Sequence, residues 1–143
     1  MAPEFELSTE ADLDNLREVR SFVKNSGQAL GAGEEAVGDL CLVVDEAVTN
    51  IILHGYAGQG GPVDVHVERD GDALVVLIRD RAKVFDPSDV ETPHLDTALA
   101  ERAYGGMGVY LIKKLTDEHQ FRARSGGGNE LRLVRRGAIS GKS

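Results

Sequence analysis

The segment that most constrains the fold is an uninterrupted apolar run, Leu74 to Ile78, which follows the turn-forming sequence Asp70-Gly71-Asp72. On the other side of that turn, residues 63–67 alternate valine with polar residues. Alternation predicts a strand with one exposed face, whereas a continuous apolar run predicts a strand that is covered on both faces. We therefore expect a hairpin that sits inside a larger sheet.

Helical patterns flank this hairpin. Thr9 and Asp12 are spaced as a capping box, and apolar residues then recur at helical spacing up to a stop signal at residues 25–27. A second helix is predicted from about Glu34 to His54, with one apolar stripe. After the hairpin, the sequence predicts a short helical stretch at 95–100, a helix at 107–117 and a last hairpin that joins 121–124 to 131–134.

These elements predict an α/β fold, a two-layer sandwich in which helices cover one face of a mixed, mostly antiparallel sheet. We expect one domain over residues 1–136 and a flexible tail over residues 137–143. The chain has 143 residues, of which 41% are hydrophobic, and this is enough for a single core. Its apolar runs fall short of a membrane helix, its N-terminus lacks signal-peptide features, and Cys41 has no partner for an internal disulfide. A cytoplasmic location is expected.

The net charge of −8 narrows the class of ligand. An acidic chain without a basic stripe is repelled by phosphate backbones, which argues against direct binding to nucleic acid or to an anionic membrane. It does not argue against ATP, because Mg²⁺, backbone N–H groups and a few cations would meet the charge of one nucleotide locally.

Two polar residues of the second helix, Glu46 and Asn50, are four residues apart and share one face, roughly opposite the apolar stripe. A solvated face is the ordinary explanation for such a pair. However, asparagine is a mediocre helix former with no cap to make in mid-helix. Its carboxamide oxygen is a suitable ligand for Mg²⁺, and a carboxylate one turn earlier could accept a hydroxyl proton.

Two further signals are weak when they are taken alone. Asp80 ends the apolar strand and could simply mark where the sheet reaches solvent, or it could accept a hydrogen bond from an exocyclic amine such as adenine N6. The glycines at 105, 106 and 108 could be a linker, or they could let backbone N–H groups approach phosphates at a helix N-terminus. The order and spacing of these signals make the combination specific.

The chain resembles the GHKL ATPase superfamily and, within it, the small anti-sigma factor serine kinases. Glu46 to Tyr56 resembles the N box of that group, Asp80 to Pro87 its first glycine box, and Gly106 to Asp117 its second. Asn129 to Val134 matches the closing strand, so the likeness covers roughly residues 5–136. The N box with its His-Gly-Tyr ending is the most specific of these motifs.

The resemblance implies roles for individual residues. Asn50 would be the Mg²⁺ ligand, Glu46 the general base toward a serine or threonine hydroxyl, and Asp80 the adenine ligand. A mobile lid would span about residues 88–104, with Arg102 as a candidate for the γ-phosphate and Arg17 and Arg20 as weaker ones. Further nucleotide-binding positions would be Ala82, Phe85, Gly105, Gly106, Met107, Gly108 and Val109.

This sequence departs from the family pattern at two places. Ala82 stands where the family has a glycine, which is tolerable if its φ is negative and obstructive if the turn needs a positive φ. Asn129-Glu130 replaces a threonine that is common near the start of the last strand, which leaves one phosphate or water contact unassigned.

The resemblance implies three possible functions. The first is a Mg-ATP-dependent serine/threonine kinase that phosphorylates a small STAS-like antagonist of the anti-anti-sigma type and sequesters a sigma factor. A homodimer is one assembly that the resemblance allows. The second is an ATP-binding partner-switching module that transfers little phosphate. The third is a histidine-kinase catalytic domain, which the absence of preceding dimerisation helices disfavours. The presence of Glu46 favours the kinase over the binding module, since a pure binder needs no base.

Overall fold

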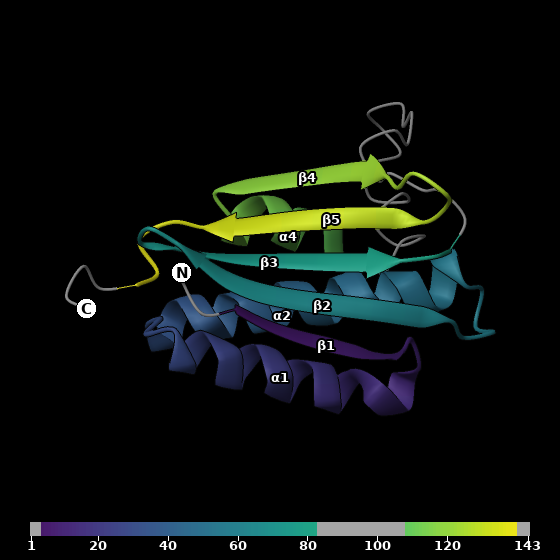
Figure 1. Ribbon diagram of the computed structural model, residues 1–143, viewed down its shortest axis with the longest axis horizontal. Helices are drawn as coiled ribbons and strands as arrows, with labels where there is room; N and C mark the ends of the chain where they lie inside the picture. Colours follow the sequence, from purple (N-terminus) through teal and green to yellow (C-terminus); the bar gives the residue numbers. More distant parts are fainter. Residues whose placement is uncertain (1–3, 83–107, 140–143) are drawn as a thin grey trace.

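The computed structural model describes residues 4–82 and 108–139. Figure 1 shows the arrangement of its helices and strands. In chain order they are β1 (Glu4–Glu10), a 3-10 turn (Leu13–Asn15), α1 (Leu16–Ala29), α2 (Glu34–Asn50), a π-helical turn (Ile51–Gly55), β2 (Pro62–Asp70), β3 (Ala73–Asp80), α4 (Gly108–Leu115), β4 (Glu118–Ala123) and β5 (Asn129–Arg135).

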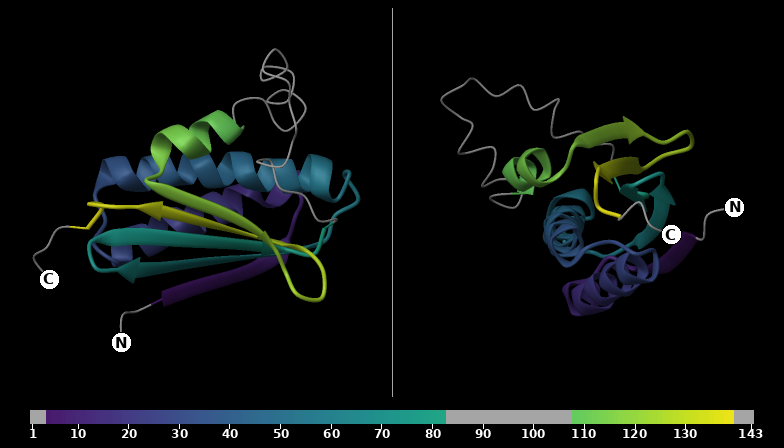
Figure 2. Two further views of the ribbon diagram at one scale, coloured as in Figure 1. Left: turned by 90° about the horizontal axis from the view of Figure 1, so that it is seen from above. Right: turned by 90° about the vertical axis from the view of Figure 1, so that its left-hand side faces the viewer.

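The five strands form one sheet in the order β1-β2-β3-β5-β4. Every pair of neighbouring strands within the described ranges is antiparallel. Figure 2 shows α1, α2 and α4 together on one face of this sheet. The predicted two-layer α/β sandwich with helices on one face is confirmed.

The core lies between the two layers. In β2 the alternation seen in the sequence places three valines, at 63, 65 and 67, on the helix-facing side, where none is exposed to solvent. Leu40, Val44 and Val48 of α2 are equally buried against them in one hydrophobic cluster. The predicted apolar stripe of the second helix therefore forms the centre of the core.

The face of β3 that points away from the helices is covered in a way that the sequence did not predict. No described helix covers it, but Val75 is still only 2% exposed because it packs with Ala73 and with Val134 of β5 in a small separate cluster. On the same face the carboxylate of Glu130 is held between the guanidinium groups of Arg79 and Arg122. Side chains of β3 and its neighbouring strands thus bury part of this face in place of a second layer.

The first helix begins and ends differently from the prediction. Thr9 belongs to β1 and donates to Glu18, while the side chain of Asp12 caps the 3-10 turn, so no capping box forms between Thr9 and Asp12. The helix also continues past residues 25–27 to Ala29. Gly27 stays helical because it packs tightly against α2, where an added Cβ would lie 2.9 Å from a methyl group of Val37.

Two residues assigned to the tail by the sequence are well packed. Ala138 and Ile139 are 6% and 4% exposed, and a β-bridge joins Ile139 to Ala32. The backbone N–H of Gly33 donates to the carbonyl of Ala138. The backbone N–H of Ile139 donates to the carbonyl of Asp72 in the β2–β3 turn. The rest of the predicted tail lies outside the described residues. Within the described part of the chain, no helix is both long and apolar enough to cross a membrane.

Candidate functional site

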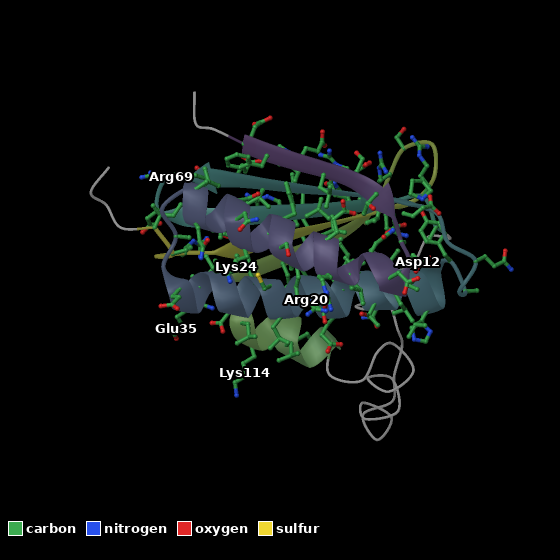
Figure 3. The ribbon with its side chains drawn as sticks, turned by 90° about the horizontal axis from the view of Figure 1, so that it is seen from below. Asp12, Arg20, Lys24, Glu35, Arg69 and Lys114 are labelled. Atoms are coloured by element: carbon green, nitrogen blue, oxygen red, sulfur yellow. The ribbon has the colours of Figure 1, made fainter. Side chains whose placement is uncertain are left out.

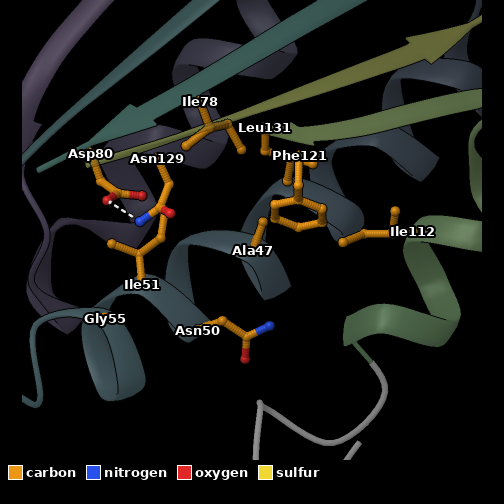
Figure 4. A pocket seen from close by; sticks show the side chains of 10 residues that line it. All are labelled: Ala47, Asn50, Ile51, Gly55, Ile78, Asp80, Ile112, Phe121, Asn129 and Leu131. Atoms are coloured by element: carbon orange, nitrogen blue, oxygen red, sulfur yellow. Dashed lines mark hydrogen bonds between the residues drawn. The ribbon is translucent and has the colours of Figure 1, made fainter. Parts of the chain in front are cut away.

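A mostly apolar pocket opens where α2 and its π-helical turn meet α4 and the ends of β3, β4 and β5 (Figure 4). Among the described residues, three polar side chains, those of Asn50, Asp80 and Asn129, line it beside apolar ones. A few polar groups in an apolar hollow are typical of a site for a small organic ligand. The apolar walls come from Ala47, Ile51, Gly55, Ile78, Ile112, Phe121 and Leu131.

Asp80 is the one charged side chain among the described residues that line this pocket. It is the last residue of β3 and only 4% exposed. One of its oxygens, Oδ1, accepts the backbone N–H of Ala82 at 2.9 Å and the side-chain Nδ2 of Asn129 at 3.0 Å. These bonds offset the cost of burying a carboxylate, and they fix its orientation.

Ala82 replaces the family's glycine without obstruction. Among the described non-glycine residues only Ala57 has a positive φ, so the backbone of Ala82 lies where any residue is allowed. Ala82 is 6% exposed and packs on Gly55, where a Cβ added to the glycine would lie 3.0 Å from the Ala82 Cβ. The methyl group therefore fills space that Gly55 leaves open.

The backbone at the end of β3 is held from two sides. Nη1 of Arg124 donates to the carbonyl of Asp80 at 3.1 Å. Gly128 comes so close that an added Cβ would lie 2.0 Å from the same carbonyl oxygen, and its φ of +97° suits glycine. The phenol of Tyr56 accepts the backbone N–H of Arg81 at 2.7 Å.

The phenol of Tyr56 also donates to the carbonyl of Pro62 at 2.6 Å. Burial raises the pKa of Tyr56, the charges of Asp80 and Glu10 raise it further, and the N–H of Arg81 opposes them only in part. The hydroxyl thus stays protonated and can donate and accept at once.

Asn50 offers an unused oxygen. Its Oδ1 is buried and, within the described part of the structure, has no hydrogen-bond partner. The residue ends α2 just before the π-helical turn, and Figure 4 shows it apart from the Asp80–Asn129 pair. An orphaned amide oxygen in a pocket is a suitable donor for a hard cation, so Asn50 fits the role of a Mg²⁺ ligand.

Glu46 lies one helical turn before Asn50 on α2. It is half-buried, and it is not among the described residues that line the pocket. Burial raises the pKa of its carboxyl group, and the charge of Asp45 raises it further. A raised pKa makes an ionised carboxylate a better proton acceptor.

Arg17 and Arg20 lie away from this pocket. Both line a separate groove between α1 and α2, together with Lys24 and Cys41. Nε of Arg20 pairs with Asp45 of α2 at 3.0 Å, so this guanidinium is held beside α2 rather than in the pocket. Figure 3 shows Arg20 on the helical side of the molecule.

The remaining predicted positions fall at the second glycine box and the lid. Gly108 and Val109 begin α4, and Ile112, one turn later, lines the pocket. The positive end of a helix dipole thus begins beside the pocket, which favours an anion there. Phe85, Arg102, Gly105, Gly106 and Met107 lie outside the described residues, as does the predicted lid.

The pocket residues that the sequence-based candidates omitted include three on the last hairpin, Phe121, Asn129 and Leu131. Asn129 was noted as the start of the closing strand and as a departure from the family pattern but was not proposed as a site residue, although strand pairing places it directly opposite Asp80. Phe121 and Leu131 are likewise paired on neighbouring strands and form one wall. Alternation along the last hairpin, combined with a register that starts from Asp80, would have identified all three.

Comparison with known proteins gives a consistent result. The family described as the histidine kinase-like ATPase domain matches residues 9–135. The serine-protein kinase RsbW of Bacillus pumilus (strain SAFR-032) is 31% identical over 118 residues, covering 76% of this chain and 71% of the relative. The anti-sigma F factor of Thermoanaerobacter sp. (strain X514) is 27% identical over 101 residues, covering 71% of each chain.

Two solved structures share the fold. One contains the RsbU and RsbW domains of a Mycobacterium tuberculosis protein, with a TM-score of 0.67 and 20% identity, and the match covers 94% of this chain but 32% of that one. The other is the SiaB–SiaC complex from Pseudomonas aeruginosa, with a TM-score of 0.64 and 18% identity over 90% of this chain and 88% of that one. At these identities the likeness concerns the fold alone.

Proposed function

Because the chain belongs to the histidine kinase-like ATPase domain family, we propose that it binds Mg-ATP in this pocket and acts as a serine/threonine protein kinase and anti-sigma factor. Its phosphoryl acceptor would be a small STAS-like antagonist, and it would sequester a sigma factor when that antagonist is not available. The names of the serine-protein kinase and anti-sigma F factor relatives support this assignment.

One observation carries the proposal: the pocket holds a buried carboxylate at one end and, at the other, a buried amide oxygen that has no hydrogen-bond partner among the described residues. Asp80 would accept a hydrogen bond from the exocyclic amine of adenine, while the apolar walls would contact the base. Asn50 would hold Mg²⁺, which neutralises phosphate charge when bound. The start of α4 would face the phosphates with its N–H groups.

Glu46 would act on the acceptor rather than on the nucleotide. Its position outside the pocket lining, one turn from Asn50, suits a group that meets a partner's hydroxyl at the edge of the site. An ionised Glu46 would accept the hydroxyl proton as the oxygen attacks the γ-phosphoryl group. The neighbouring pair between Arg20 and Asp45 ties α1 to this part of α2.

The direct test is phosphate transfer. Small STAS-like proteins that co-purify with this chain from its native host would be incubated with it, Mg²⁺ and γ-labelled ATP, and label on each would be measured. We expect label on one antagonist and ATP-dependent binding to a sigma factor. If ATP binds and changes partner affinity but no antagonist takes up label, the function is that of a partner-switching module.

A further inference from the structure

The hydrogen bond between Asn129 and Asp80 decides which oxygen of the carboxylate is left for a nucleobase. Oδ1 of Asp80 takes two N–H donors, one from the backbone of Ala82 and one from Asn129. Both bonds that the described residues make to this carboxylate side chain end on that one oxygen. The other oxygen, Oδ2, is thus the acceptor that Asp80 offers to a ligand.

From this geometry we infer that Asn129 is a positioning residue that makes the pocket selective for adenine over guanine. The inference rests on the nucleotide site of the proposed function. Adenine presents a single exocyclic amine, which one acceptor oxygen can satisfy. Guanine presents two parallel donors, N1–H and N2–H, which match both oxygens of a carboxylate rather than one.

The placement of Asn129 suits this role. It begins β5 directly opposite Asp80, and it is 9% exposed at one end of the pocket. Its carboxamide is short, and strand pairing fixes its backbone, so it holds the carboxylate in one rotation. The next residue, Glu130, points to the opposite face of the sheet and bonds to Arg79 and Arg122. The chain thus supplies a matched control one position away.

Asn129→Ala removes one of the two hydrogen bonds to Oδ1 of Asp80, so that the carboxylate can rotate. Guanine could then approach both oxygens, while adenine would lose a preoriented acceptor. Titration calorimetry with ATP and with GTP would measure the ratio of the two affinities. We expect wild type to favour ATP by at least about tenfold, and Asn129→Ala to reduce this ratio by about tenfold or more.

The control Glu130→Gln disturbs the same strand on its other face, so it should keep the ATP-to-GTP ratio within about twofold of wild type. Circular dichroism would confirm that both variants are folded. If Asn129→Ala is folded and keeps the wild-type ratio, the inference is wrong, although the proposed nucleotide site stands. If wild type binds neither nucleotide, the proposed site itself fails and the inference falls with it.

Asn129→Asp gives a second readout that a purely structural role would not produce. It would place two carboxyl groups in contact, so that one of them holds a proton until a higher pH. ATP affinity of this variant should fall as pH rises from about 5 to 8, whereas wild type should change by less than about threefold. A variant with the flat profile of wild type would contradict the role of Asn129 in positioning the carboxylate.

Discussion

The phenol oxygen of Tyr56 lies 2.7 Å from the backbone nitrogen of Arg81, which joins the end of the N box to the residue that follows Asp80. The same hydroxyl donates to Pro62 at the start of β2. Gly61 makes room for the ring of Tyr56, because an added Cβ would lie 2.3 Å from a ring carbon, which is too close for any real side chain. One side chain thus connects three segments at the edge of the pocket.

Tyr56→Phe should therefore destabilise the fold. The variant keeps the ring but leaves the N–H of Arg81 and the carbonyl of Pro62 without this partner, at a cost of about 1–3 kcal/mol. Urea unfolding should show a lower midpoint with an unchanged slope. ATP affinity should fall as well, because Arg81 directly follows Asp80. An unchanged midpoint would mean that water replaces both bonds at no cost.

Asp80→Asn should weaken ATP binding by roughly 10- to 150-fold. The new amide must turn its oxygen toward the donors on Ala82 and Asn129, and its NH₂ group would then face the amine of adenine. Titration calorimetry gives the affinity. Asp64→Asn is a matched control, because Asp64 lies on the neighbouring strand outside the pocket lining. Equal ATP affinities for the two variants would contradict the role of Asp80.

Gly128 and Gly126 allow steric contact to be separated from backbone strain. Both have positive φ, +97° and +89°, but an added Cβ meets the Asp80 carbonyl only at Gly128 and open space at Gly126. Gly126→Ala should cost about 1–3 kcal/mol for the backbone conformation alone. Gly128→Ala should cost about 2 kcal/mol more and also reduce ATP affinity. Equal unfolding free energies for the two variants would rule out the contact.

Local patterns were sufficient to predict much of this fold. The apolar stripe of α2 and the alternating valines of β2 are periodic signals, and burial follows directly from them. The turn at Gly71 was equally readable, since its φ of +64° is what glycine allows. Asp80 and Asn50 could be identified as candidates because each breaks an otherwise apolar or helical pattern.

Long-range contacts could not be predicted in the same way. Asn129 meets Asp80 across 49 residues, and only the register of β3 with β5 brings them together. Gly27 appeared to be a stop signal, but its missing side chain serves a helix contact that no local pattern reveals. Ile139 looked like part of a tail because its partner, Ala32, is more than one hundred residues away.

Glu130→Gln should weaken the fold in a pH-dependent way. Burial alone would raise the pKa of Glu130, but the bonds and charges of Arg79 and Arg122 outweigh it and lower the pKa from its ordinary value of 4.5. A lowered pKa means that this stabilisation is present above about pH 4.5 and is lost as pH falls through the folded value.

The glutamine variant should thus lose about 1–2 kcal/mol at pH 7, and the difference should shrink toward pH 3. Urea unfolding of both proteins across this range measures it. If the difference stays constant from pH 7 to pH 3, the loss comes from packing rather than from the charge of Glu130.

Glu46→Gln separates a general base from a bystander. The variant cannot accept the hydroxyl proton, so transfer of phosphate to the antagonist should fall by about 10²- to 10⁴-fold. Its Mg-ATP affinity should barely change, because Glu46 lies outside the pocket lining. Asn50→Ala should weaken both Mg-ATP binding and transfer, since Asn50 supplies the buried oxygen. Transfer by Glu46→Gln at the wild-type rate would exclude Glu46 as the base.

The raised pKa of Glu46 adds a pH signature to this experiment. Transfer by wild type should fall as pH drops through a value above the ordinary 4.5, because the protonated carboxyl group cannot act as a base. The same shift means that the folded state loses stability as pH rises through the pKa that Glu46 has in the folded protein, because its carboxyl group then ionises. Glu46→Gln should therefore be at least as stable as wild type at pH 7. If the variant is less stable than wild type, unfolding explains its lost transfer. If it is stable and its residual transfer no longer falls at low pH, the fall seen in wild type comes from protonation of Glu46.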